Sequence, residues 1–289
     1  MSNTMTIDIN TNFCDTNVIF FEIDYISFAN GYQIDDNLFN IARLFPNLRI
    51  LDMYCANVVC HSFGNKLNNM KMLEEVKFPS ECSLMHLDGT FKGCEHLRRV
   101  DLGHMPYLIS MKGTFEGCKE LEIVEASGVF GDLLNMESTF RGCSNYSPKM
   151  LPFIAPNLAI IHRAFMGTAV TSFEFRTMVV EGGSVMFEPT EIDWAFADCE
   201  LLESLSFENV TFDNFDNLSE YSGGFENLLK GSRNFKILKI NDRESWGPTL
   251  NYVLMTDCSG NREGCATMLL GILKGDSIRD GVQPTLHFD

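Results

Sequence analysis

The sequence has no long hydrophobic run. Its longest apolar stretches are short pieces such as residues 268–273, far below the roughly 18 apolar residues that a membrane-spanning helix needs. Residues 1–17 are polar, and the apolar run at 18–23 is too short and too interrupted for a secretory signal. We therefore expect no membrane insertion and favour an intracellular location. The cell surface or secretion is the alternative, if an export signal has been removed.

Positive charge is scarce. The chain has 22 Lys and Arg against 39 Asp and Glu, which gives a formal net charge of -17. A field of this sign repels phosphate backbones and anionic membranes. The composition therefore argues against nucleic acid as a partner and favours partners that carry a basic surface.

The motifs of the familiar enzyme classes are also missing. The sequence contains no glycine-rich phosphate loop, no metalloprotease helix with paired histidines and no nucleophile elbow. Cys55, Cys60 and His61 come closest to a metal site, but they lack a second ligand pair at a suitable spacing. We predict no catalytic residue, metal or cofactor. An enzyme with an unrecognised site, such as a Cys-His nucleophile, is one of the alternatives.

A returning phrase dominates what the sequence does contain. It consists of an apolar residue, a Phe four positions later and, three positions after the Phe, a Cys or Thr. Its central Phe residues step by 24, 25, 25 and 31 positions, and units of roughly 20–29 residues are typical of leucine-rich coils. The phrase occupies residues 87–94, 111–118, 136–143, 161–168 and 192–199.

The spacing inside one unit predicts a short helix followed by a strand. Leu87, Phe91, Cys94 and Leu97 are spaced four, three and three apart, as on one face of a helix. After Leu97 the apolar residues alternate with polar ones, as in a strand with one buried row. Because each unit has an apolar stripe that it cannot cover alone, the units should stack on one another.

This pattern predicts an α/β repeat solenoid. We expect a leucine-rich-repeat-like curved array of about eight strand-plus-short-helix coils with end caps. The predicted organisation is a strand-rich N-terminal cap at 1–40, the solenoid at 41–246 and a C-terminal cap at 247–289. Two longer spacings predict insertions at 179–189 and 212–224, and insertions in such arrays often contact the ligand.

The cysteines repeat with the coils. The sequence contains 10 Cys, and Cys94, Cys118, Cys143 and Cys199 each follow the Phe of their unit by three residues. Equivalent positions in stacked coils lie about 5 Å apart, so we interpret these residues as small core residues with free thiols. Free thiols favour a reducing compartment.

The wording Thr-Phe-x-Gly-Cys-x-x-Leu-x-x-Val-x-Leu, best developed between Leu87 and Phe207, resembles the leucine-rich repeats of the BspA-like surface proteins. The resemblance is plausible from Ala42 to Ile240 and implies a scaffold that binds proteins or extracellular matrix. It does not imply one target, because members of such families share the scaffold and differ in what they bind.

The outward residues of the predicted strands are the candidate binding residues, since each strand should present them on the concave face. Most are charged, with a few apolar residues among them, which is the pattern of anchors inside a polar rim. The candidates are Ile50, Asp52, Tyr54, Glu75, Lys77, Arg99, Asp101, Ile123, Glu125, Glu174, Arg176, Ile237 and Lys239.

The favoured function is that of a non-enzymatic scaffold for protein–protein interaction, which binds a macromolecular partner through the concave strand face or the inserted loops. The first alternative is a structural subunit of a larger assembly, such as a viral or cell-surface particle, in which flat apolar patches would bury against further copies. The protein partner stays unidentified, and a homo-oligomer is compatible with the sequence.

Overall fold

The computed structural model describes residues 3–8, 19–35, 41–175, 178–180, 183–185, 191–207, 228–235 and 237–240 of the 289-residue chain. Contacts within the chain divide it into two compact units. Unit 1 comprises Met1–Asn135, Gly142–Tyr146 and Pro152–Ala155, and unit 2 comprises Met136–Arg141, Ser147–Leu151 and Pro156–Asp289.

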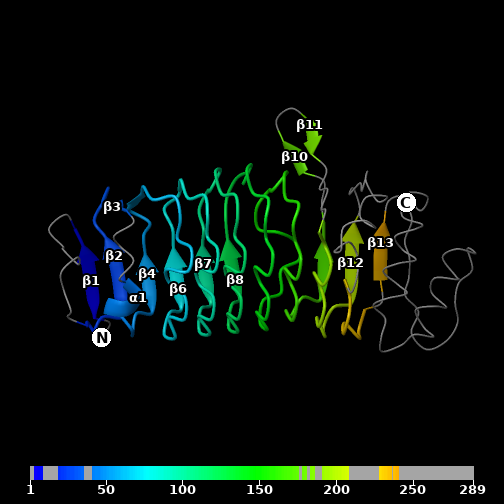
Figure 1. Ribbon diagram of the computed structural model, residues 1–289, viewed down its shortest axis with the longest axis horizontal. Helices are drawn as coiled ribbons and strands as arrows, with labels where there is room; N and C mark the ends of the chain where they lie inside the picture. Colours follow the sequence, from blue (N-terminus) through cyan, green and yellow to red (C-terminus); the bar gives the residue numbers. More distant parts are fainter. Residues whose placement is uncertain are drawn as a thin grey trace, which may run out of the picture. The chain divides into compact units, whose positions relative to one another are not determined.

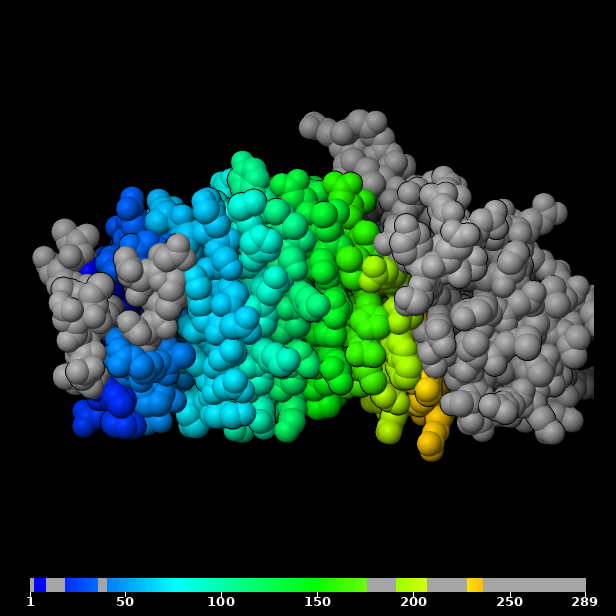
Figure 2. Space-filling view, viewed as in Figure 1, coloured from blue at the N-terminus to red at the C-terminus, as the bar shows by residue number. Residues whose placement is uncertain are grey.

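Unit 1 is a stack of coils whose strands form one six-stranded parallel sheet with the order β1-β2-β4-β6-β7-β8. The colours in Figures 1 and 2 run from blue to green through this unit, because the coils follow one another in chain order. A second, two-stranded parallel sheet pairs β3 with β5. The elements are β1 (Thr4–Ile7), β2 (Tyr25–Phe28), β3 (Gln33–Ile34), α1 (Ile41–Leu44), β4 (Ile50–Asp52), β5 (Asn57–Val58), β6 (Glu75–Lys77), β7 (Arg99–Asp101) and β8 (Ile123–Glu125).

Unit 2 contains a three-stranded parallel sheet with the order β13-β12-β9, formed by β9 (Ser172–Glu174), β12 (Ser204–Phe207) and β13 (Ile237–Ile240). Two further strands, β10 (Met178–Val180) and β11 (Gly183–Val185), pair as an antiparallel hairpin. This hairpin coincides with the insertion predicted at 179–189. The insertion predicted at 212–224 and the cap predicted at 247–289 lie outside the described residues.

The repeat solenoid is confirmed, in the form of a parallel β-solenoid. The finer prediction, about eight coils with a helix in each, is not. Within the described residues the α-helix is confined to the four residues of α1, and successive turns occupy the segments for which helices were predicted. None of the helices described here has the length and apolar character needed to cross a bilayer.

Backbone hydrogen bonds explain why turns replace the helix. Between residues 87 and 94, alternate N–H groups leave the coil. The amides of Leu87, Gly89, Phe91 and Gly93 donate to carbonyls of the next coil, while those of Thr90, Lys92 and Cys94 donate back three residues. An α-helix would direct each amide to the carbonyl four residues earlier. Half of the amides instead join one coil to the next.

This turn geometry requires a left-handed backbone at two positions of each coil. Gly89 and Gly93 have φ values of 60° and 72°, and Gly113 and Gly117 repeat the pattern with 59° and 77°. Glycine adopts these values without the steric penalty of a side chain. The Gly of the returning phrase is therefore a backbone requirement of the turn, which also explains why a helix cannot continue through it.

The Phe residues of the phrase fill the core as predicted. Phe91 and Phe115 are fully buried, and their rings stack with centroids 5.7 Å apart. In unit 2, Phe165 stacks on Phe140 at 5.5 Å and on Phe196 at 5.1 Å. Stacked aromatic pairs stabilise a fold by more than their buried area alone would give. The Phe column therefore links each coil to its neighbours.

We predict that Gly103→Ala destabilises unit 1 more than Gly31→Ala does. Both glycines have positive φ, 62° and 74°, so each substitution should cost about 1–2 kcal/mol of backbone strain. A Cβ on Gly103 would also collide with the Pro79 carbonyl, whereas nothing lies within 4 Å of a Cβ on Gly31. That collision should add about 1–3 kcal/mol. Urea unfolding measures both losses, and equal losses would contradict the close stacking of the coils.

Candidate protein-binding face

The predicted outward row lies on the exposed side of the main sheet in unit 1. In β6 and β7 the central residues Val76 and Val100 are buried, while the residues on either side are half-buried. β4 has the same pattern, and in β8 the two flanking residues are exposed. The predicted alternation of inward and outward residues is therefore confirmed for these four strands. We call their outward side the strand face.

Strand register arranges the candidates in two columns on the strand face. Directly paired residues in a parallel sheet lie on the same face, about 4.8 Å apart. The first column holds Ile50, Glu75, Arg99 and Ile123, and the second holds Asp52, Lys77, Asp101 and Glu125.

Most of the charges on the strand face have partners. The Lys77 ammonium lies 3.4 Å from a Glu75 carboxylate oxygen, and the Arg99 guanidinium lies 2.5 Å from that of Glu125. These side chains are substantially exposed, so each pair contributes little to stability. Four acids and two bases leave this part of the face with a net negative charge.

Asp52 and Asp101 also hold the backbone of the turn that follows their strand. The Asp52 carboxylate accepts a hydrogen bond from the backbone N–H of Tyr54 at 3.0 Å and one from the Tyr25 hydroxyl at 3.1 Å. The Asp101 carboxylate accepts from the N–H of Gly103 at 3.0 Å. Such bonds two residues ahead fix the turn after a strand. These two predicted binding residues therefore have a structural role that the sequence analysis did not identify.

Two apolar side chains stand out among the charges. Tyr54, just after β4, is 60% exposed, and Ile123 at the start of β8 is 40% exposed. Both are large enough to act as anchors, because aromatic and aliphatic residues surrounded by polar groups dominate many interfaces. They are the residues of the strand face that a partner could desolvate at the lowest cost.

Four of the candidate binding residues lie outside unit 1, and the structure describes them in less detail. Glu174 is half-buried on β9 of unit 2. Ile237 and Lys239 belong to β13, where they pair in register with Ser204 and Ser206 of β12. Arg176 lies outside the described residues. The strand face of unit 1 therefore excludes these four candidates.

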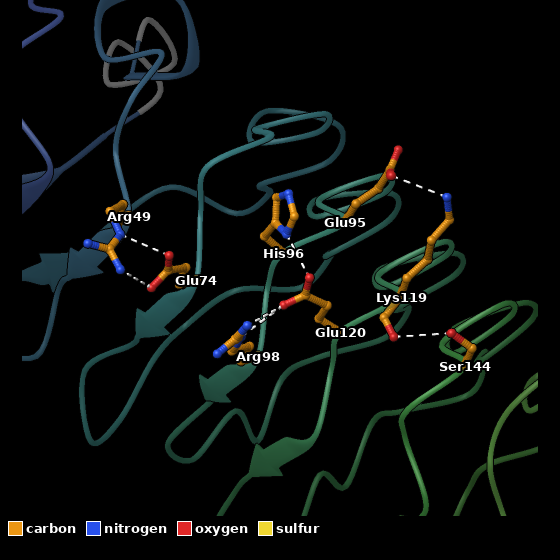
Figure 3. A network of polar contacts seen from close by, with 8 residues as sticks. All are labelled: Arg49, Glu74, Glu95, His96, Arg98, Lys119, Glu120 and Ser144. Atoms are coloured by element: carbon orange, nitrogen blue, oxygen red, sulfur yellow. Dashed lines mark hydrogen bonds and ion pairs between the residues drawn. The ribbon is translucent and has the colours of Figure 1, made fainter.

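A ladder of alternating charges borders the strand face on the side where the chain enters each strand. Arg49 pairs with Glu74 at 2.8 Å, and Glu95 lies between Lys71 at 2.7 Å and Lys119 at 3.2 Å. Figure 3 shows Arg49 reaching toward Glu74, and Lys119 toward Glu95, across successive coils. Opposite charges at neighbouring positions favour the native register, since a slipped coil would lose the matched pairs.

A third acid in the ladder connects two bases from the preceding coil. Glu120 accepts hydrogen bonds from Arg98, at 2.6 Å to Nη2, and contacts His96 Nδ1 at 2.8 Å. The hydrogen bond from Arg98 is the main cause that lowers the pKa of Glu120, and His96 adds to it. These groups are exposed or half-buried, so the ladder acts on register and solubility more than on total stability.

The buried thiols are hydrogen-bond donors of the core. Cys118 Sγ donates to the Phe91 carbonyl at 3.1 Å, and Cys143 Sγ donates to that of Phe115 at 3.0 Å. Burial raises the pKa of Cys94 to about 12 and also raises that of Cys118. Neutral thiols are poor nucleophiles, so this column is suited to packing.

The Cys55, Cys60 and His61 pattern is divided between surface and core. The Cys60 side chain is buried, while Cys55 and His61 are exposed. Among the residues that the structure describes, no group of three or more His, Cys, Asp and Glu side chains is placed to hold a metal ion. All seven described cysteines are free.

The sequence analysis missed a second face of unit 1, which we call the apolar face. It consists of residues 59–62, 83–86, 106–110 and 131–135, and Asp132 is its one acidic residue, with no Lys, Arg or Glu. Tyr107 and Leu134 on this face are 57% and 46% exposed. The signal was present as apolar residues at the coil period, Met85, Ile109 and Leu134, but it lies outside both the phrase and the strands.

Fold and faces together define the protein as a parallel β-solenoid built of sequence repeats. A scan against protein-family models finds no match to the chain, and a search of curated proteins finds none either.

We predict that Glu95 titrates at an unusually low pH. Hydrogen bonds from Lys71 and Lys119 lower the pKa of Glu95 to about 2, from an ordinary value of 4.5. Because the folded pKa is depressed, its stabilising effect is complete above about pH 4.5 and is lost as the pH falls toward 2. Carbon-detected NMR titration of the side-chain carboxyl measures this pKa directly.

Replacement of either lysine tests the cause of this shift. Lys71→Met and Lys119→Met should each raise the pKa of Glu95 toward its ordinary value. Lys92→Met is the matched control, because Lys92 pairs with Glu116 at 2.8 Å. An unchanged Glu95 pKa in both test variants would contradict the ladder.

Proposed function

We propose that the chain is a non-enzymatic scaffold that binds a protein through the strand face of unit 1. The observation that carries this proposal is the pair of exposed apolar residues, Tyr54 and Ile123, in a row where Lys77 and Arg99 already have acidic partners. Paired charges orient a partner, while buried apolar anchors supply most of the affinity.

The charge of the strand face suggests the chemistry of this partner. Asp52, Glu75, Asp101 and Glu125 outnumber Lys77 and Arg99, and the whole chain carries a net charge of -17. A partner with a basic surface would associate faster with such a face and would depend on ionic strength. The proposed partner is therefore a protein with apolar pockets surrounded by Lys and Arg.

The proposed setting follows from the repeats. The resemblance to BspA-like leucine-rich repeats supports a binding scaffold of about eight coils, with membership of that family as part of the proposal. All seven described cysteines are free, which supports a reducing, intracellular compartment. A structural subunit of a larger assembly is the second candidate, because the apolar face is suited to contacts between copies.

A binding comparison tests the role of the anchors. Tyr54→Ser and Ile123→Ser together should reduce capture of the wild type's partners more than tenfold, since each anchor is expected to contribute about 2 kcal/mol. Met72→Ser is the matched control, because Met72 is another exposed apolar residue but lies outside the strand face. Quantitative mass spectrometry of proteins captured on immobilised wild type and variants gives the readout.

A stability control and one contradicting outcome complete that comparison. The unfolding midpoints of the three proteins should agree, because the substituted side chains are exposed. If the double variant captures the same proteins in the same amounts as wild type, the strand face is not the binding face.

A further inference from the structure

We propose that a second copy of this chain binds the apolar face of unit 1, so that the protein self-associates through that face. This inference goes beyond the scaffold function proposed for the strand face, because it uses a different face and a different partner. It specifies the contact between copies on which the second candidate function rests. It rests on three features of the apolar face: a continuous apolar stripe, a near absence of charge and an arrangement compatible with a two-fold axis.

The stripe runs across successive coils. Parallel bridges join His86 to Ser110 and Ser110 to Asn135. Beside them, the amide of Ile109 donates to the Met85 carbonyl at 2.8 Å, and that of Leu134 donates to the Ile109 carbonyl at 3.0 Å. Met85, Ile109 and Leu134 therefore lie side by side, about 4.8 Å apart along the stack.

These residues are available for contact. Leu134 is exposed, Met85 and Ile109 are half-buried, and Tyr107 is exposed two residues before Ile109. Val59, in an earlier coil of the same face, is also exposed. Scattered exposed apolar residues need no explanation, but a stripe that continues over neighbouring coils forms a contiguous patch, and such patches mark interaction sites.

Charge favours a second copy as the occupant. Two molecules of net charge -17 repel each other, and they repel least where ionised groups are fewest. The ladder and the strand face present charged residues coil after coil, whereas the apolar face carries Asp132 as its one acid and no Lys, Arg or Glu. A charged partner would be attracted to the other faces. A second copy meets its lowest electrostatic cost here.

The stripe is suited to a two-fold contact. With the axis beside Ile109, each Ile109 meets its equivalent in the other copy, and Met85 of each copy meets Leu134 of the other. Such an interface is self-complementary. The patch spans four coils, or roughly 15–20 Å at the spacing of parallel strands. A square patch with sides of that length covers roughly 200–400 Å², which is less than the roughly 800 Å² per partner of stable complexes. The expected dimer is therefore weak and concentration-dependent.

Sedimentation velocity of the full chain tests the proposal. The mean mass of wild type should rise with protein concentration, and added salt should strengthen the association by screening the repulsion between acidic copies. Leu134→Lys and Tyr107→Lys should each weaken the association at least tenfold, because each places a charge in the contact. Ile123→Lys is the matched control on the strand face and should leave the association unchanged.

Three other outcomes would overturn the proposal. Wild type that stays monomeric at every concentration shows that the apolar face does not bind a second copy. Association that Ile123→Lys abolishes and Leu134→Lys does not shows that the copies meet through the strand face. Association that added salt weakens shows that charge attraction holds the copies together. Equal unfolding midpoints of wild type and variants confirm that folding is unaffected.

Cross-linking tests the two-fold geometry independently. In Ile109→Cys the two introduced thiols face each other across the axis, so mild oxidation should yield a disulfide-linked dimer. Ile123→Cys is the control, and it accounts for the exposed native thiol of Cys55. Equal cross-linking of the two variants would refute the predicted axis.

Discussion

The hydrogen bonds that leave each turn segment for the next coil are the constraint on which the rest of the structure depends. Every second amide between Leu87 and Gly93 donates across the stack, so this turn segment must keep the same path and the same length in two neighbouring coils. The left-handed positions, the Phe column and the charge ladder all repeat at this period. A residue that breaks the path in one coil therefore affects the coils on both sides.

Unit 2 shows how this constraint is met without glycine. Arg163 and Trp194 occupy the first left-handed position of their coils, with φ values of 54° and 57°, where most side chains are strained. The Lys230 ammonium lies 4.5 Å from the Trp194 ring centroid and the Arg163 guanidinium lies 5.8 Å from it. These cation–π contacts offset part of the strain.

The sequence predicts the core of this fold well. The phrase identifies Phe91 and Phe115 as stacked core residues, and the alternation after Leu97 identifies the outward row, because burial leaves a strong period in the sequence. It does not separate helix from turn, since spacings of four, three and three suit both. The paired glycines of some coils, such as Gly89 and Gly93, are the signal that would have separated them, because a helix interior disfavours glycine.

The binding faces are harder to predict than the core. Met85, Ile109 and Leu134 follow one another at the coil spacing, but they lie outside both the phrase and the predicted strands. The sequence analysis therefore missed the apolar face. The roles of Asp52 and Asp101 in their turns, and the pairing of Arg99 with Glu125, depend on register between coils. Register is a property of the folded stack, which one sequence read coil by coil does not reveal.

Deletion of one whole coil is the most direct test of this account. Removing residues 92–115 joins Phe91 to Glu116 and preserves the phrase, so the shortened protein should keep its parallel β circular dichroism and unfold cooperatively in urea. The deletion brings Lys71 beside Lys119, a surface repulsion of at most about 1 kcal/mol. Removal of half a coil, residues 92–103, should abolish folding because it breaks the register. Equal behaviour of the two deletions would contradict a fold that rests on a fixed coil period.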